Sequence, residues 1–343
     1  MTDESNALPP EVTDAIRVML DEAGVTANKA LVARILATGV MLGTDGTSRL
    51  DLKITSAAVS EMREAFALFR PYADRRKVTV FGSARTQTDD PLYHRARDVS
   101  AALAAQGWMV VTGAGPGIMQ AAAEGAGPEM SLGVSIQLPF EEKPNEIVMD
   151  SPRVEMKYFF TRKLMLVKES SGFICVPGGF GTLDEMFELL TLQQTGKAEP
   201  QPIVLLDQPG GTFWKGLEGY VQEQMVPAGV ISADDFERVL VTDSVEEAVA
   251  EITGFWRNYD SLRWVGKELV LRMRQAPTEA QLADLNERFA GVCAAGEIQR
   301  TDPLPPEAAD RDRLDLARVK LVPQQRHIGS LHHLIRAINA LVD

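Results

Sequence analysis

The residues with the clearest chemical potential are a carboxylate just after a glycine-rich turn and a basic pair that precedes the turn. The turn is Pro177-Gly178-Gly179-Phe180-Gly181-Thr182; Glu185 follows it, and Arg162-Lys163 come before it. Glycines leave backbone N–H groups open to a close ligand, and a helix that begins there adds the positive end of its dipole. We therefore expect an anion, and specifically a phosphate, at this turn, with Glu185 beside it.

Thr182 and Glu185 also fit a second interpretation. A Thr followed three residues later by a Glu is the pattern of a capping box, in which Thr182 would be the N-cap and Glu185 would hydrogen-bond back to it. This pattern explains the pair, but it does not explain Gly178, Gly179 and Gly181. The sequence leaves open whether Glu185 faces the cap or the ligand.

The basic pair lies in a segment that is apolar nearly all round, so its two cations need an anionic partner or a path to water. They could extend to the surface, or pair with Glu155 or Glu169. Alternatively, Arg162 faces a phosphate or a sugar hydroxyl beside Glu185. The order of the elements allows Arg162 to lie beside Glu185, because the helix with Arg162 leads into the strand that ends at the turn.

Short apolar strands alternate with helices in the middle of the chain. We predict strands at 77–81, 108–112, 132–138, 172–176, 203–206 and 239–241. We predict helices at 92–106, from 118 onward, and at 154–169, 183–195, 213–224 and 245–259. This alternation predicts an α/β fold with right-handed crossovers, in which a parallel sheet is flanked by helices.

Three glycine-bearing turns follow predicted strands, at 82–85, 113–117 and 177–181. Ligands of such sheets bind beyond the carboxyl ends of the strands, so we expect the three turns to meet. The turn at 113–117 is not a dinucleotide fingerprint, because Ile118 stands where a small residue is needed. It is either a tight turn that permits close helix packing or a nucleotide contact. The turn at 177–181 is not a kinase-type P-loop, because no Gly-Lys-Ser/Thr follows it.

Both ends of the chain are predicted to be helical extensions of a central domain. Residues 1–74 carry three helical runs, at 10–21, from Asn28 onward and at 56–69. The nucleotide-binding catalytic domain is expected at 75–260, and a second helical extension at 261–343. The last helix of that extension is predicted from the spacing of Leu331, Leu334, Ile335, Ile338 and Leu341.

Composition excludes several classes of function. The net charge of −13 over 343 residues argues against nucleic acids and anionic membranes as partners. Two unpatterned cysteines, and four histidines of which none is at i, i+4 spacing with another, indicate no disulfide framework and no metal site. Neither a signal-peptide pattern nor a bilayer-length apolar run is present, so we expect a soluble, cytoplasmic protein without a cofactor.

Arg162-Lys163 together with Pro177 to Glu185 resembles the R-K…P-G-G-x-G-T-x-x-E signature of the LOG ("Lonely Guy") family. These are cytokinin riboside 5′-monophosphate phosphoribohydrolases and bacterial nucleotide nucleosidases, often labelled lysine decarboxylase-like. Residues 81–83, 113–119 and 138–141 also look like this family, and the resemblance covers about residues 75 to 255. Ala114 is a departure, since many members have glycine there, and it affects the fine shape of that turn.

The resemblance implies a Rossmann-like fold and a homodimer or higher homo-oligomer with active sites near the subunit interface. It also implies hydrolysis of the N-glycosidic bond of a nucleoside 5′-monophosphate, either AMP or a cytokinin riboside monophosphate. By matching position, Arg162 and Glu185 form the catalytic pair. The substrate- and phosphate-binding residues it implies are Gly82, Ser83, Gly115, Lys163, Pro177, Gly178, Gly179, Gly181 and Thr182.

Two other functions remain open from the residues alone. A non-catalytic carrier of a nucleotide or phosphorylated cofactor would keep the glycine turn, but it would not need Arg162 and Glu185. An amino-acid decarboxylase rests on the family label, and no residue points to a pyridoxal-phosphate lysine.

Overall fold

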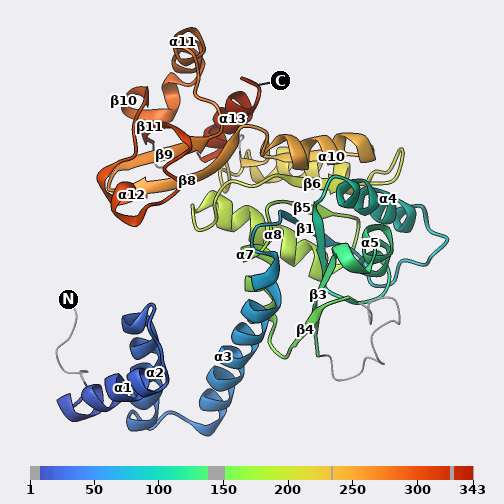
Figure 1. The fold of residues 1–343 in the computed structure, drawn as a ribbon. Coiled ribbons are helices and arrows are strands. Elements are labelled where there is room, and N and C mark those ends of the chain that lie inside the picture. Colours follow the sequence, from blue (N-terminus) through green and yellow to red (C-terminus); the bar gives the residue numbers. More distant parts are fainter. Residues whose placement is uncertain (1–7, 138–150, 233–234, 325–327, 343) are drawn as a thin grey trace. The chain divides into compact units, whose positions relative to one another are not determined.

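The computed structural model describes residues 8–137, 151–232, 235–324 and 328–342 (Figure 1). The chain divides into two compact units, Met1–Arg63 and Glu64–Asp343. The segment at 138–141 that resembles the LOG family lies outside the described residues, as does His327, one of the four histidines.

The N-terminal unit contains α1 (Pro10–Glu22), α2 (Lys29–Thr44) and the first part of α3 (Arg49–Phe69), which confirms the three predicted helices. Ile16 and Leu20 of α1 are buried, whereas no residue of α2 is. Asn28 precedes α2 as expected, but its side chain makes no capping hydrogen bond.

Seven parallel strands form the main sheet, in the order β4-β3-β2-β1-β5-β6-β7. Along the chain these are β1 (Lys77–Phe81), β2 (Met109–Thr112), β3 (Ser131–Ile136), β4 (Arg153–Met156), β5 (Phe173–Cys175), β6 (Ile203–Leu206) and β7 (Val239–Thr242). The chain moves outward from β1 to β4 on one side and from β5 to β7 on the other. The topological switch point, where ligands of such sheets bind, therefore lies between β1 and β5.

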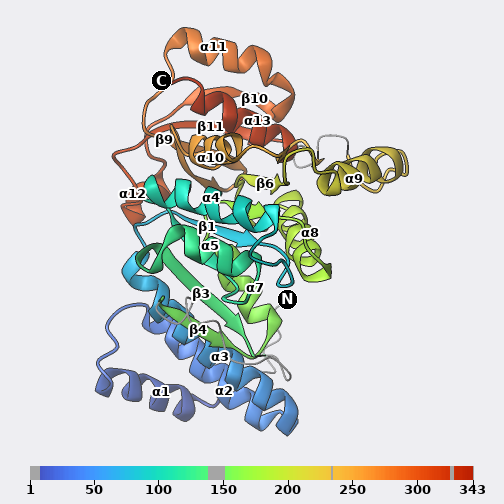
Figure 2. The ribbon, with the colours of Figure 1, turned by 90° about the vertical axis from the view of Figure 1, so that its right-hand side faces the viewer.

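Helices cover both faces of this sheet, which confirms the predicted α/β class (Figure 2). On one face, α4 (Pro91–Ala105) packs against α5 (Ile118–Ala126) and α10 (Val245–Gly254). The other face carries α7 (Phe159–Lys168) and α8 (Phe180–Gln194). The buried residues of these two helices include Met165 and Leu166 of α7 and Met186 and Leu189 of α8.

The predicted helix at 154–169 begins later than expected. Residues Arg153–Met156 instead form β4, an edge strand in which Val154 pairs with Val134 of β3. The strand is short and alternates exposed with buried side chains, whereas the helical prediction rested on the apolar residues that follow it. The correction shortens α7 to the segment that carries Arg162.

Residues 259–323 contain a second sheet, so the predicted helical extension at 261–343 was wrong for this segment. Four antiparallel strands run in the order β10-β11-β9-β8. They are β8 (Tyr259–Val265), β9 (Glu268–Met273), β10 (Cys293–Arg300) and β11 (Ala317–Pro323), with α11 (Glu279–Arg288), α12 (Pro305–Asp310) and α13 (Ile328–Asn339) beside them. The predicted last helix is confirmed as α13. The core of this sheet is continuous with the α10 side of the main sheet, and the boundaries predicted at residues 75 and 261 stay predictions.

The remaining elements are short. They are α9 (Phe213–Tyr220), a π-helical turn at Val221–Met225, and 3₁₀ turns at Arg70–Tyr72, Pro128–Met130 and Ala290–Val292. None of the helices in the described residues combines the length and apolar character that crossing a bilayer requires.

Candidate active site

Two glycine-bearing turns meet at the switch point of the main sheet. The turn after β1 carries Ser83, and the turn after β5 carries Gly178. A methyl group on Gly178 would lie 3.0 Å from the backbone nitrogen of Ser83 and would overlap Oγ1 of Thr182. Glycine at 178 thus allows these two backbone segments and the start of α8 to approach each other closely.

The turn at 177–181 leads directly into α8 and leaves its backbone open. Gly179 is the N-cap of α8, and its carbonyl accepts the hydrogen bond from the N–H of Leu183 at 3.1 Å. Thr182 is therefore inside the first helical turn, so the capping-box interpretation of Thr182 and Glu185 was wrong. Among the described residues, no atom beyond the adjoining backbone lies within 4 Å of the position of a Cβ on Gly179 or Gly181. The N–H groups at this helix start can be reached by an anion.

Arg162 of α7 and Glu185 of α8 lie together next to this turn. Nη1 of Arg162 is 3.7 Å from Oε1 of Glu185, and their side chains are 10% and 14% exposed. Nε of Arg162 donates a hydrogen bond to the carbonyl of Val134 in β3 at 3.0 Å. The alternative in which Arg162 extends to the surface was wrong, and the meeting of this cation with Glu185, expected from the topology, is present.

Burial dominates the electrostatics of Glu185. It raises the pKa of the carboxyl to about 7, although the charges of Arg162 and Lys163 act in the opposite direction. Within the described residues, no hydrogen bond reaches this carboxylate. A carboxyl group with a pKa near 7 that no neighbour saturates can both accept and release a proton near neutral pH.

Comparisons with known proteins agree with this geometry. A family model described as "Possible lysine decarboxylase" matches residues 116–252. A cytokinin riboside 5′-monophosphate phosphoribohydrolase of Mycobacterium tuberculosis is 32% identical over 177 residues, which are 48% of this chain and 88% of that protein. The chain belongs to the LOG family.

Two further proteins are similar to about half of this chain. The Mycobacterium marinum protein with the same description is 31% identical, over 51% of this chain and 92% of its own. A molybdenum cofactor binding protein from Rippkaea orientalis matches at 20% identity and a TM-score of 0.38, over 51% of this chain and 93% of that chain. The second likeness carries no argument about function. About half of this chain lies outside the LOG-like match.

Lys163, the second residue of the LOG basic pair, contacts carboxylates of α8. Its Nζ lies 2.6 Å from Oδ2 of Asp184 and 3.0 Å from Oε2 of Glu188. Burial lowers the pKa of Lys163, but the two hydrogen-bonded carboxylates outweigh burial and leave the pKa raised. Lys163 thus holds α7 against α8 and thereby Arg162 against Glu185. Its predicted phosphate contact stays a prediction.

Gly82 and Gly115, both predicted substrate contacts, lie against side chains of α5. A methyl group on Gly82 would come 2.6 Å from Cβ of Ile118, and one on Gly115 would come 2.6 Å from Cε of Met119. The carbonyl of Ser83 accepts a hydrogen bond from the N–H of Ile118 at 3.0 Å. These contacts favour the close-packing interpretation for the turn at 113–117, and the substrate roles of Gly82, Ser83 and Gly115 stay predictions.

Two groups that shape the site were not predicted from sequence. Val134 supplies a carbonyl acceptor, which its residue type does not reveal. Gly113 was treated only as a turn glycine, yet a methyl group on it would overlap Nη2 of Arg162. The signal available in the sequence was the position of Gly113 directly after β2, at the same end of the sheet as Glu185.

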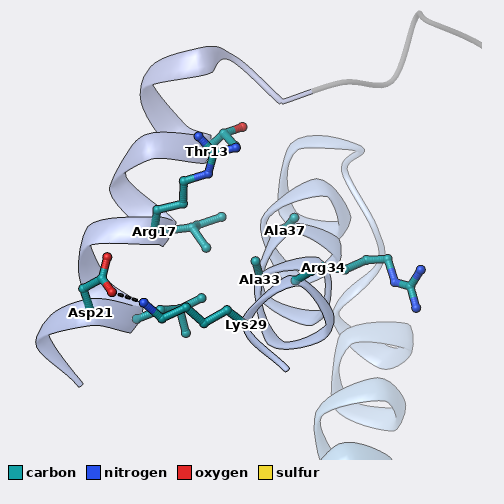
Figure 3. Close-up of a pocket in the computed structure, with 10 residues that line it drawn as sticks. Thr13, Arg17, Asp21, Lys29, Ala33, Arg34 and Ala37 are labelled. Carbon is teal, nitrogen blue, oxygen red and sulfur yellow. Dashed lines mark hydrogen bonds and ion pairs between the residues drawn. The ribbon is translucent and has the colours of Figure 1, made fainter. Parts of the chain in front are cut away.

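A separate groove of about 570 Å³ lies between α1 and α2 in the N-terminal unit (Figure 3). Ile16, Leu20 and Ala33 are among its lining residues, and Lys29 forms an ion pair with Asp21 at its side. The charged members of this groove are solvent-exposed. Across the parts of the chain that the structure describes, no three His, Cys, Asp or Glu side chains are grouped to hold a metal ion.

Proposed function

We propose that this protein hydrolyses the N-glycosidic bond of a nucleoside 5′-monophosphate and releases the free base and ribose 5-phosphate. AMP and cytokinin riboside monophosphates are the substrates proposed. The observation that carries the proposal is the buried Arg162–Glu185 pair beside an open glycine turn at the switch point of the sheet. A phosphate site alone would explain the turn, but it would not explain a largely buried carboxylate next to it.

In this proposal the 5′-phosphate binds at the start of α8. The N–H groups of residues 179–182 point out of a helix N-terminus, where the helix dipole favours negative charge. Gly179 and Gly181 leave room for phosphate oxygens to reach them. With the phosphate held there, the ribose extends from the turn toward the Arg162–Glu185 pair.

The chemistry assigned to the pair is hydrolysis through an oxocarbenium-like transition state. The bond from C1′ to the base nitrogen breaks, and the base leaves with the electron pair while positive charge develops on the ribose. The Glu185 carboxylate stabilises that charge and takes a proton from the water that attacks C1′. The same proton then passes to the departing base. Arg162 holds the carboxylate in place and contributes positive charge near the phosphate.

This role gives a pH dependence with a defined sign. Glu185 acts as the ionised carboxylate, and burial raises its pKa to about 7. We therefore expect kcat/KM for AMP, which reports the free enzyme, to increase tenfold per pH unit well below 7 through the ionisation of Glu185 and to level off above it. A kcat/KM that stays flat between pH 5 and 8 would contradict the assignment of Glu185 as the base.

The deciding experiment is a substrate panel with a matched pair of variants. AMP, other nucleoside monophosphates, adenosine and lysine are incubated with the full chain, and free base and cadaverine are followed by chromatography. We expect base release from monophosphates, and a loss of at least about 100-fold in Glu185→Gln. Glu218→Gln, which removes an exposed carboxylate of α9, is the control and should keep wild-type turnover.

The other outcomes of the substrate panel distinguish the hydrolase from a carrier and from a decarboxylase. Tight AMP binding without base release from any monophosphate would contradict the hydrolase proposal and favour the carrier. Cadaverine formation from lysine would favour the decarboxylase, which the contacts of Lys163 with two carboxylates argue against. A Glu185→Gln variant with full activity would remove Glu185 from the mechanism.

We also propose that the protein acts as a homodimer or higher homo-oligomer through the outer surfaces of α7 and α8. These two helices carry Arg162 and Glu185, and they expose large apolar side chains. The exposed residues are Phe159, Phe160, Leu164, Phe180 and Phe187. Phe180 is 93% exposed and lies within the glycine turn itself. Exposed large apolar side chains on the two helices that carry the pair favour an interaction site here, and a second copy would exclude water beside the reacting atoms.

Size-exclusion chromatography with light scattering measures the mass of the oligomer and so tests whether this surface is an interface. Leu164→Glu is expected to lower the mass toward the 37.5 kDa of one chain and to reduce turnover. Leu314→Glu is the control, since Leu314 is similarly exposed, at 45% against 47% for Leu164, and lies in the C-terminal region. Equal masses for wild type and Leu164→Glu would refute this interface.

A further inference from the structure

We infer that Gly113 is a positioning residue for the catalytic pair: it is glycine because the guanidinium of Arg162 occupies the space where any side chain at 113 would lie. The inference rests on the proposed function and deepens it, because it names a residue that fixes the geometry of the same site. Gly113 follows β2 directly and is buried. It has no assigned role in binding or in catalysis.

The space around Gly113 is filled by two side chains. A methyl group built on its Cα would overlap Nη2 of Arg162, lie 3.3 Å from Cζ of Arg162, and lie 2.7 Å from Sδ of Met119. The thioether of Met119 is flexible and can move aside. Arg162 cannot move in the same way, because its other nitrogens are already engaged.

Three elements fix the guanidinium from different directions. Nε donates to the carbonyl of Val134 in β3, Nη1 lies 3.7 Å from Oε1 of Glu185 in α8, and Nη2 sits over Gly113. A side chain at 113 would overlap Nη2 and push the guanidinium away from its observed position. The cation would then leave either the Val134 carbonyl or the Glu185 carboxylate.

Backbone conformation does not explain the glycine. The φ of Gly113 lies outside the left-handed region, unlike that of Gly117 in the same turn, whose φ is +68°. An alanine could therefore adopt the backbone of residue 113 without strain. Glycine is required because the guanidinium of Arg162 occupies the position of a Cβ at residue 113.

The inference predicts that Gly113→Ala acts only through Arg162. A displacement of about 1 Å at a catalytic group can cost about 100-fold in rate, so we expect kcat to fall by roughly that factor. Arg162→Met should cost at least as much. The kcat of the double variant should be no lower than that of Arg162→Met alone, because Nη2 of Arg162, which the new methyl would displace, is then absent. A double variant that is clearly worse than either single variant would overturn the inference.

A second readout needs no turnover, so it separates this inference from the hydrolase proposal. In the described part of the chain, the titratable groups that interact electrostatically with Glu185 are Arg162 and Lys163 from α7, Asp184 and Glu188 from α8, and Cys175 from β5. The Arg162 charge lowers the pKa of Glu185, so moving or removing that cation should raise it. The carboxyl resonance, assigned with Glu185→Gln, is titrated by ¹³C NMR in wild type, Gly113→Ala, Arg162→Met and the double variant.

We expect the pKa of Glu185 to rise in both single variants and to rise no further in the double variant. Gly216→Ala is the control: among the described residues, no atom beyond the helix's own backbone lies within 4 Å of its Cβ position in α9, so it should leave the titration unchanged. A Gly113→Ala protein with wild-type titration and wild-type kcat would refute the inference. If Gly113→Ala fails to fold, adding Arg162→Met must restore folding, and a double variant that also fails to fold would refute it.

Discussion

The two glycine turns at the carboxyl ends of β2 and β5 look alike in sequence but differ in what surrounds their glycines. In the turn at 113–117, each glycine faces another part of the protein within 3 Å: Arg162 and Met119 at Gly113, Met119 at Gly115, and the backbone after β1 at Gly117. In the turn at 177–181, a Cβ on Gly179 or Gly181 would have no atom of the described residues within 4 Å beyond the adjoining backbone.

This difference separates two uses of glycine. The first turn is glycine-rich because the protein's own atoms occupy the space, so its glycines determine packing and the position of Arg162. In the second turn, Gly178 also permits close packing, against Ser83 and Thr182, but Gly179 and Gly181 border a space that the described residues leave open at a helix N-terminus, where an anion can bind. Substitutions in the first turn should therefore change stability or geometry, and substitutions of Gly179 or Gly181 should change binding.

Gly117→Ala should have the largest effect on stability. Gly117 has a φ of +68°, where alanine is strained by about 1–2 kcal/mol. Its methyl group would also lie 2.8 Å from the carbonyl carbon of Ala84 and would overlap the carbonyl oxygen of Ser83, both of them backbone atoms. We expect a loss of about 3 kcal/mol or more, measured by urea or thermal unfolding followed by circular dichroism. Wild-type stability in this variant would contradict the claim that the glycines of the turn at 113–117 are required by packing.

Gly181→Ala should show the opposite behaviour. Residue 181 lies in the first turn of α8, where alanine is favoured over glycine, so stability should stay constant or rise by up to about 1 kcal/mol. The methyl group would enter the space proposed for the phosphate, and we expect KM for AMP to rise by about tenfold or more. Gly216→Ala in α9 controls for a helical substitution into open space. An unchanged KM would mean that the phosphate does not lie over Gly181.

The sequence was sufficient to predict those strands whose position is determined by a local pattern of apolar residues. Lys77–Phe81 and Ile203–Leu206 are buried runs rich in branched or aromatic residues, and both were predicted with their observed bounds. Local pattern failed for β10, which exposes most of its side chains and pairs through a register shift with β11. Such an edge strand is stabilised by backbone pairing to distant residues, and its sequence carries no alternation that would indicate it.

The site could be predicted in its chemistry but not in its contacts. Arg162 and Glu185 were identified from their residue types and from the order of the elements that carry them. Which nitrogen of Arg162 meets which neighbour depends on how α7, β3 and the turn at Gly113 pack together, and no local pattern encodes that packing. For the same reason, the sequence left open whether Glu185 belongs to a cap or to a ligand site.

Ala114→Gly should have the smallest effect and tests how far the first turn depends on backbone shape alone. Ala114 has a φ of 57°, which costs alanine about 1–2 kcal/mol relative to glycine. Glycine relieves that strain, but it also gains about 0.5–1 kcal/mol of conformational freedom in the unfolded chain. The two terms nearly cancel, so the free energy of unfolding should change by less than about 1 kcal/mol, with kcat for AMP within a factor of two. A large loss of kcat in Ala114→Gly, with stability unchanged, would show that the methyl group of Ala114 helps to position the site, and that this turn is not defined by space and backbone angles alone.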